Sequence, residues 1–186
     1  RLLMAAPLFL GLDLSTQSLT ALAVEAESDR VHDWSLVFDR DLPVYGTRHG
    51  VLPHPDPLVV HADPRMWAEA LDTLLLRLAA DGQTPRVAGI ALSAQQHGTV
   101  YLTKAFTPRL AALDPARPLA AQLEGIFSRP TAPIWMDAST APECAELDAA
   151  LGGGVRFASL TGSVATERFA GPQIRKFWKE DPAAYS

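Results

Sequence analysis

The chain of 186 residues has little of several features that mark particular classes of protein. Cys144 is the only cysteine, which excludes an intrachain disulfide and a cysteine-rich zinc site. A single cysteine is typical of a reducing compartment, and we therefore expect a cytoplasmic protein. The net charge of −5 comes without a dense basic run, which argues against a nucleic-acid partner. No apolar segment is as long as a membrane span, so no membrane partner is expected.

Two phosphate-binding signatures are absent as well. The sequence contains neither a glycine-rich loop of the Walker type nor a dinucleotide fingerprint. What the chain does have is an ordinary globular composition, with 48% hydrophobic and 20% charged residues. Its length suits one domain with a sizeable core.

The order of the expected elements predicts an α/β domain with a mixed sheet. Strands are expected at residues 8–14, 19–24 and 31–38, joined by short turns. A proline-rich loop at 40–61 follows. Helices and short strands then alternate. The expected helices are at 64–80, 119–127, 140–151 and 172–180. The expected strands are at 87–92, 99–102 and 133–136, and a loop is expected at 107–118. Asp63 is the expected cap of the first helix, whose apolar face is Trp67, Ala70, Leu71, Leu74, Leu75 and Leu78, and Thr140 with Glu143 has the spacing of a capping box.

The first candidate site lies in the stretch Leu8–Val24. Leucines at 8, 10, 12 and 14 alternate with Phe9 and Gly11, so both faces are apolar and a central strand is predicted. Asp13 interrupts this run, and the polar turn Ser15, Thr16, Gln17 and Ser18 follows. Such a turn can converge on an anion, and the stretch can hold a metal-bound phosphate. Two alternatives remain: a hairpin with an ordinary polar turn, and a secretory signal, which Asp13 interrupts early.

A second group of candidates follows later apolar strands. Gln95, Gln96 and His97 come after the strand at 87–92, and the ends of strands in open α/β sheets are where ligands bind. Two amides and an imidazole suit a polyhydroxy ligand, although a buried histidine bonded to backbone is the alternative. Asp137 can fix a loop, cap the next helix or contact a ligand. Arg168 can clamp neighbouring oxygens or form an ordinary salt bridge with Glu167 or another neighbour.

Several motifs, taken together, resemble the FGGY carbohydrate kinases. They are GLDLSTQS, SAQQHG, PIWMDAST, LTG and ATERFAGPQIRKFWKEDPAAYS, and they follow one another in order from Phe9 to Ser186. Within this family the chain is most similar to the animal-type branch that phosphorylates D-xylulose. The resemblance implies an actin-like, ribonuclease H-like fold, with residues 1–186 as an incomplete N-terminal domain of a two-domain kinase that uses ATP and Mg.

The resemblance also implies roles for individual residues. Asp13 is expected to bind metal or phosphate, with Ser15, Thr16, Gln17 and Ser18 around the phosphates of ATP. His97 and Arg168 match residues that contact the sugar, and Gln96 lies beside that pocket. Ser139 stands where many bacterial relatives have the arginine of a WxDxR motif, which puts substrate contacts at that position in doubt. The aspartate that acts as catalytic base and the ATP-binding domain are expected beyond Ser186.

Three hypotheses follow for function. The first is that the parent protein phosphorylates a ketopentose, D-xylulose above all, while residues 1–186 alone are inactive. The second is a sister kinase for another sugar or polyol. The third is a truncated, non-catalytic sugar-binding domain. In each case an exposed sheet without its partner domain predicts an apolar patch and self-association, including a possible homodimer.

Overall fold

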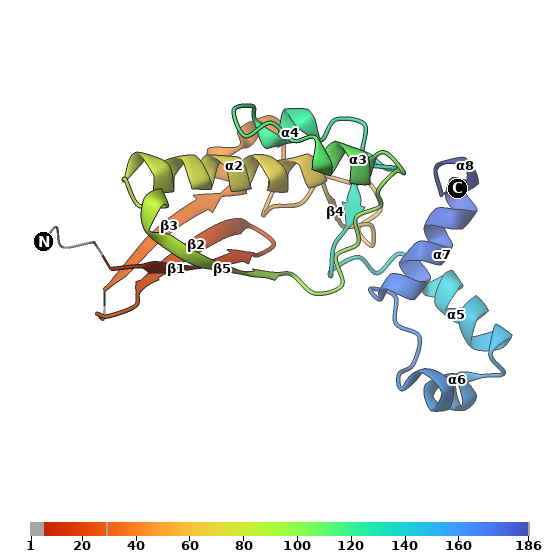
Figure 1. Ribbon diagram of the computed structural model, residues 1–186. Coiled ribbons are helices and arrows are strands. Elements are labelled where there is room, and N and C mark those ends of the chain that lie inside the picture. The colour runs from red at the N-terminus through yellow and green to blue at the C-terminus, as the bar shows by residue number, and fades with distance from the viewer. Residues whose placement is uncertain (1–5, 29, 186) are drawn as a thin grey trace, which may run out of the picture.

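A four-stranded mixed sheet forms the centre of the computed structural model, which describes residues 6–28 and 30–185 (Figure 1). Its strands are β1 (Leu8–Leu14), β2 (Ser18–Glu25), β3 (Val31–Val37) and β5 (Val87–Ala94). They lie in the order β3-β2-β1-β5. The first three strands form an antiparallel meander, whereas β5 pairs with β1 in parallel. The predicted mixed sheet and the central place of β1 are therefore confirmed.

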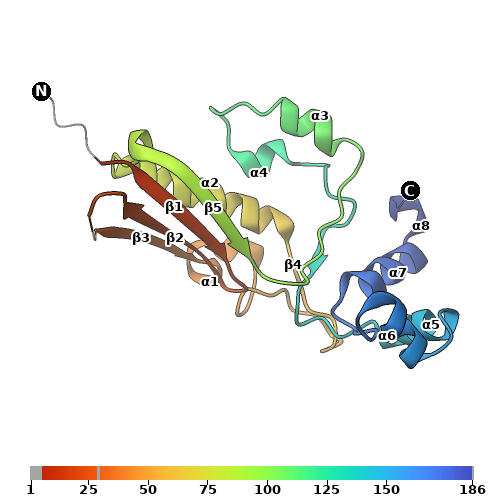
Figure 2. The same cartoon turned by 60° about the horizontal axis from the view of Figure 1, so that its bottom comes forward.

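The helix α2 (Pro64–Ala80) connects the meander to β5 and covers one face of the sheet (Figures 1 and 2). Asp63 caps it as predicted, because its side chain accepts a hydrogen bond from the backbone N–H of Arg65 at 2.9 Å. The buried row on α2 consists of Met66, Ala70, Leu74 and Leu78, which pack against Leu8, Leu10 and Leu19 of the sheet. The sequence prediction missed Met66 and wrongly included Leu75, which is 37% exposed. The residues that α2 buries against the sheet are spaced four apart, and Met66 belongs to this row whereas Leu75 does not.

The sheet keeps much apolar surface exposed. Phe9 of β1 and Leu22 of β2 are 53% and 47% exposed on the face opposite α2. Ile90 and Leu92 pair with Leu10 and Leu12, so they lie on the α2 side, yet they are 63% and 70% exposed because α2 does not cover β5. The apolar patch predicted from the sequence is therefore present on both faces, over β1 and β2 on the face opposite α2 and on the edge strand β5 on the α2 side.

Short elements replace several predicted ones between the sheet and the C-terminal helices. The proline-rich segment contains α1 (Phe38–Asp41), a 3₁₀ turn (Pro43–Tyr45) and β4 (His61–Ala62), which pairs with β6 (Ala132–Pro133). A further 3₁₀ turn (Thr84–Arg86) precedes β5. Residues 99–102 were wrongly predicted as a strand, since only Leu102 makes a bridge, with Phe127. The loop expected at 107–118 contains most of α3 (Phe106–Ala111), and α4 (Leu119–Gln122) is far shorter than the predicted helix.

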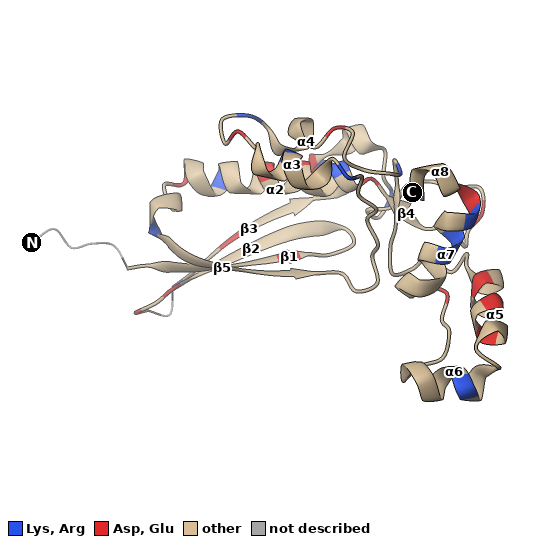
Figure 3. Ribbon diagram, turned by 45° about the vertical axis from the view of Figure 1, so that its right-hand side comes forward, with Lys and Arg blue, Asp and Glu red and all other residues tan. Residues whose placement is uncertain are grey.

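Four helices at the C-terminal end lie beside the sheet and α2 rather than over them (Figure 1). They are α5 (Ala141–Ala150), α6 (Gly154–Thr161), α7 (Ala170–Glu180) and α8 (Pro182–Tyr185). Acidic residues of α5 face basic residues of α7, and Lys179 contacts Glu143 and Glu146 at 2.7 Å each (Figure 3). The helix α6 was missed, because three glycines at its start indicated a stop. No helix of the described residues has both the length and the apolarity that crossing a bilayer needs.

The capping box predicted at the start of α5 is wrong. Thr140 stands at the cap position, but its side chain makes no capping hydrogen bond. Its hydroxyl instead donates to the backbone oxygen of Glu167 at 2.5 Å, and Glu143 pairs with Lys179. A fully buried hydroxyl needs a hydrogen-bond partner, and the carbonyl of Glu167 provides it. Asp137 does not cap α5 either, because its oxygens are engaged elsewhere.

Candidate functional site

The parallel pairing of β1 with β5 brings two of the predicted site segments to one edge of the sheet. Asp13 pairs with Ser93, and the two strands end together at Leu14 and Ala94. The backbone N–H of Gln95 then donates to the carbonyl of Leu14 at 3.1 Å. The polar turn after β1 and the Gln95–Gly98 segment after β5 therefore begin side by side, as expected for the carboxyl ends of parallel strands.

The turn after β1 is tightly built. Ser15 and Ser18 bond to each other through their hydroxyls at 3.0 Å, and the N–H of Ser15 donates to the carbonyl of Ser18 at 2.9 Å. The carbonyl of Gln17 accepts from Phe38 at 2.9 Å. Gly50 lies against this turn with a φ of 77°, and a Cβ atom there would come within 2.0 Å of the carbonyl oxygen of Thr16. Only glycine allows this approach, so the loop at 48–51 supports the turn.

Asp13 lies on the face of the sheet opposite α2 and is exposed to solvent. The sequence suggested a costly carboxylate inside an apolar run, but exposure removes that cost. Asp13, Thr20 and Ser93 line a shallow depression of about 290 Å³ together with apolar residues of β1, β2 and β5. Within the described ranges 6–28 and 30–185, no three acidic, histidine or cysteine side chains gather into a group that could hold a metal by themselves.

His97 is exposed, so the alternative of a buried histidine bonded to backbone is wrong. Its backbone has a φ of 61°, an uncommon conformation for a residue other than glycine. Its ring stacks on that of Phe169, with centroids 4.7 Å apart and planes at 29°. Phe169 precedes α7, so this contact joins the segment after β5 to the loop that carries Arg168. Gln96 is also exposed beside His97.

Arg168 lines a cavity of about 300 Å³. The other lining residues come from two loops and are Trp135, Met136, Asp137, Ala138, Thr166 and Glu167. Arg168 is exposed and, within the described part of the chain, forms no ion pair with Glu167, contrary to the alternative considered from the sequence. Its guanidinium is therefore available to a ligand. Gln96 and His97 do not line this cavity, and His97 reaches its neighbourhood only through Phe169.

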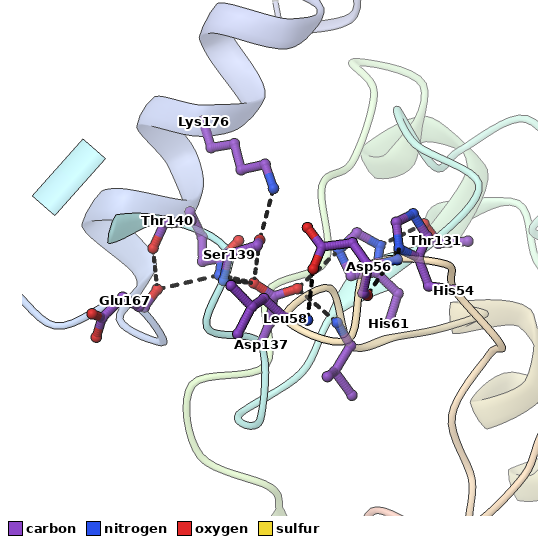
Figure 4. A network of polar contacts seen from close by, with 12 residues as sticks. His54, Asp56, Leu58, His61, Thr131, Asp137, Ser139, Thr140, Glu167 and Lys176 are labelled. Carbon is purple, nitrogen blue, oxygen red and sulfur yellow. Dashed lines mark hydrogen bonds and ion pairs between the residues drawn. The ribbon is translucent and has the colours of Figure 1, made fainter. Parts of the chain in front are cut away.

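A buried hydrogen-bond network around Asp137 holds the cavity wall in place (Figure 4). One carboxylate oxygen of Asp137 accepts from the Ser139 hydroxyl at 2.6 Å and from the Gln173 amide at 2.8 Å. The other accepts from the backbone of Val60 at 2.9 Å and lies 3.3 Å from Nε2 of His61. Burial would raise the pKa of Asp137, but these partners outweigh burial and hold that pKa well below its usual range. Asp137 therefore fixes its own loop against the Val60–His61 segment and against α7, and fixing a loop was one of the roles considered from the sequence.

Comparison with known proteins agrees with the motifs. The chain is 44% identical over 178 residues to the xylulose kinase of Mus musculus, which covers 95% of this chain and 32% of the mouse protein. It is 43% identical to the probable D-xylulose kinase A of Aspergillus clavatus and 41% identical to xylulose kinase 2 of Arabidopsis thaliana, over 96% of this chain in each case. No family model matches the chain.

The chain resembles the N-terminal part of a xylulose kinase. It spans about a third of the length of these curated relatives. The structure superposes on the xylulose kinase of Rhodospirillum rubrum with a TM-score of 0.69 at 20% identity, and on that of Bifidobacterium adolescentis with 0.66 at 21%. These superpositions cover 96% and 98% of this chain and 31% of each solved chain. They confirm the predicted actin-like fold.

The likeness to xylulose kinases makes Ser139 informative. At this position, where the sequence lacks the expected arginine, Lys176 of α7 donates to the Ser139 hydroxyl at 2.7 Å. The positive charge of Lys176 on α7 therefore lies next to Ser139, which is in a loop. Sequence reasoning missed Lys176, and it also missed Trp135 and Phe169 as parts of the site. The aromatic residues next to Asp137 and Arg168 were the available signal, because each lies within a motif that was already recognised.

We expect Asp137→Asn to lower the free energy of unfolding at neutral pH by about 1–3 kcal/mol, because an amide N–H would face groups that donate to the carboxylate. The pKa of Asp137 is depressed in the folded state, so its contribution is complete above the unfolded value near 3.8 and is lost as the pH falls. Urea unfolding measured from neutral pH down to about pH 2 should show the gap between wild type and variant narrowing in acid.

The matched control is Asp33→Asn, which changes an exposed carboxylate on β3. Its effect should stay within about 0.5 kcal/mol at every pH. A gap for Asp137→Asn that is equally large at neutral and acid pH would contradict the role assigned to the ionised carboxylate.

Proposed function

We propose that this chain is the sugar-binding part of a kinase that transfers the γ-phosphoryl group of ATP to a hydroxyl of D-xylulose. The observation that carries the proposal is the identity of 41–44% to named xylulose kinases over at least 95% of the chain. The geometry supports it, because a phosphate-type turn and a cavity with a free guanidinium lie at one end of the sheet.

In this proposal each candidate residue has a defined task. Arg168, His97 and Gln96 bind the hydroxyl groups of the sugar and orient the acceptor oxygen. The turn formed by Ser15, Thr16, Gln17 and Ser18 faces the phosphates of ATP through the Thr16 hydroxyl and through backbone N–H groups other than that of Ser15, which donates to Ser18. Positioning and charge neutralisation supply most of the catalysis in phosphoryl transfer.

Asp13 would hold Mg²⁺ in the proposed complex. A single exposed carboxylate fits this ion, because Mg²⁺ in kinases is bound by one or two carboxylates together with waters and substrate phosphates. When bound, the ion neutralises charge on the phosphates. Asp13 carries the charge that attracts it, and Thr20 and Ser93 beside Asp13 offer hydroxyl groups to its waters.

The reaction also needs groups that the 186 residues do not provide in this proposal. The sugar hydroxyl attacks the γ-phosphorus, the bond to the bridging oxygen of ADP breaks, and the hydroxyl proton passes to an aspartate. We assign that aspartate and the adenosine-binding surface to the two-thirds of the relatives' length that this chain does not span. The runner-up proposals are a sister kinase for another sugar or polyol and a non-catalytic sugar-binding domain.

We expect the full-length protein that contains this chain to release ADP with D-xylulose in a coupled assay, and to act more weakly on other pentoses, hexoses, glycerol and gluconate. Residues 1–186 alone should release none, because the contacts to adenosine and the base are missing. Turnover on glycerol or gluconate but not on D-xylulose would show that the proposed substrate is wrong. Sugar-dependent ADP release by residues 1–186 that disappears in Asp13→Ala would show that the site is complete within this chain.

His97→Ala should weaken the binding of D-xylulose to the full-length protein about 2- to 10-fold, since one hydrogen bond to the sugar is lost. The melting temperature should hardly change, because the side chain is exposed. Calorimetric titration and thermal unfolding measure the two effects. His54→Ala, at another exposed histidine in the 40–61 segment, is the control and should change neither. A large fall in melting temperature with unchanged sugar affinity would make His97 a structural residue.

We further propose that residues 1–186 associate with themselves through the uncovered apolar side chains of β1 and β5. Phe9, Ile90 and Leu92 are each more than half exposed there. Light scattering should report a mass that rises with concentration, and Leu92→Lys should lower it by placing a charge on the edge strand. A monomer at every concentration would count against the association, and an unchanged mass in Leu92→Lys would place the contact elsewhere.

A further inference from the structure

One hydrogen bond connects the phosphate turn directly to the wall of the sugar cavity. The indole N–H of Trp135 donates to the hydroxyl oxygen of Thr16 at 2.9 Å, across 119 residues of sequence. Thr16 lies at the tip of the turn after β1, and Trp135 lines the cavity that also contains Arg168. The two halves of the proposed active site are therefore joined by a polar contact between these two side chains.

Each end of this contact is held in place by its surroundings. Ile134, next to Trp135, is 1% exposed, and its carbonyl accepts from the N–H of Asp137 at 2.9 Å. The tryptophan therefore projects from a loop that the Asp137 network fixes. On the other side, Gly50 packs against the carbonyl of Thr16. The two loops are thus well supported, whereas the Trp135 side chain itself is 39% exposed and can still be restrained by a ligand that packs against it.

The chemistry of the two groups gives the bond a direction. An indole nitrogen can only donate, so the Thr16 oxygen is the acceptor and its own hydrogen remains to be donated. The neighbouring hydroxyls of Ser15 and Ser18 already bond within the turn. Thr16 therefore presents the turn's free O–H group, and Trp135 fixes the rotamer of that group. An anion at the turn is the natural acceptor for it.

We propose that Trp135 is a positioning residue that couples the sugar cavity to the phosphate turn through Thr16. This inference rests on the proposed kinase function and deepens it. A sugar that packs against the indole ring restrains the ring, and the restrained ring holds the Thr16 hydroxyl toward the phosphates of ATP. Because binding coupling is reciprocal, Mg-ATP strengthens sugar binding by the same factor as sugar strengthens the binding of Mg-ATP.

The sharpest test is Trp135→Phe in the full-length protein, which keeps an aromatic wall but removes the N–H group. The affinity for D-xylulose alone should stay within about twofold. The KM for Mg-ATP should rise and kcat should fall, each by about 3- to 10-fold, the effect of one hydrogen bond. The magnesium complex of a non-hydrolysable ATP analogue should be titrated with and without D-xylulose. The factor by which D-xylulose raises the affinity for this complex should fall toward one in Trp135→Phe.

A double-mutant cycle identifies Thr16 as the route of the coupling. Thr16→Val keeps the shape of the side chain and removes the hydroxyl, so it should weaken the use of Mg-ATP at least as much as Trp135→Phe does. The double variant should be no worse for Mg-ATP than Thr16→Val alone, because Trp135 acts only through the hydroxyl that Thr16→Val already removes. Thr16→Ser restores the hydroxyl and should recover most of the coupling. A purely structural contact would change the melting temperature instead of this pattern.

A second measurement needs no substitution. The indole N–H signal of Trp135 in nuclear magnetic resonance should move when the magnesium complex of the ATP analogue is added to the wild-type protein, while Trp34 on β3 should not respond. An unmoved Trp135 signal contradicts the proposal. The proposal is also contradicted if the effects of Trp135→Phe and Thr16→Val on the kinetics with Mg-ATP multiply in the double variant. A loss of sugar affinity in Trp135→Phe with unchanged kinetics for Mg-ATP contradicts it as well. A wild-type protein that phosphorylates no sugar refutes the kinase function instead.

Discussion

The parallel pairing of β1 with β5 is the constraint on which the rest of the structure depends. It places Asp13 beside Ser93 and brings the segments after both strands to the same edge of the sheet. A parallel pair requires a crossover, and α2 provides it while burying Met66 and Leu74 on one face of the sheet. A one-residue shift in this register would turn Asp13 toward α2, where a carboxylate has no partner. The register thus decides both the core and the location of the polar turn at residues 15–18.

Much of the fold was predictable from the sequence because its signals are local. Alternating leucines predicted β1, and the Asp63–Pro64 pair predicted the start of α2. The errors occurred where long-range contacts outweigh local preference. Thr140 has a capping sequence but bonds to Glu167, which comes 27 residues later. The short strands β4 and β6 exist because they pair with each other, and neither segment has a strong periodic pattern of its own.

The candidate site shows the same division between local and long-range information. Motifs led to Asp13, His97 and Arg168 as candidates, and their residue types suit the proposed chemistry. No local pattern shows that the His97 ring stacks on Phe169 or that Trp135 bonds to Thr16, since each contact joins distant segments. Position 139 is a further example. It holds a serine where the related motif has an arginine, and Lys176 from the distant helix α7 donates to the hydroxyl of that serine. Chemical function at this site depends on groups that the tertiary structure brings together.

The topology of the sheet has a consequence for the order in which the chain folds. The meander β1-β2-β3 joins neighbours in sequence, so it can form while the chain is still being synthesised. Closing β5 onto β1 instead pairs Leu8 with Val87, across about eighty residues, and the loop-closure entropy makes this contact a late one. Until then, β1 is itself an unpaired edge with leucines on one face. The hairpin that carries the polar turn at residues 15–18 is thus formed early, and until β5 arrives its first strand is an open edge that can pair with a wrong strand.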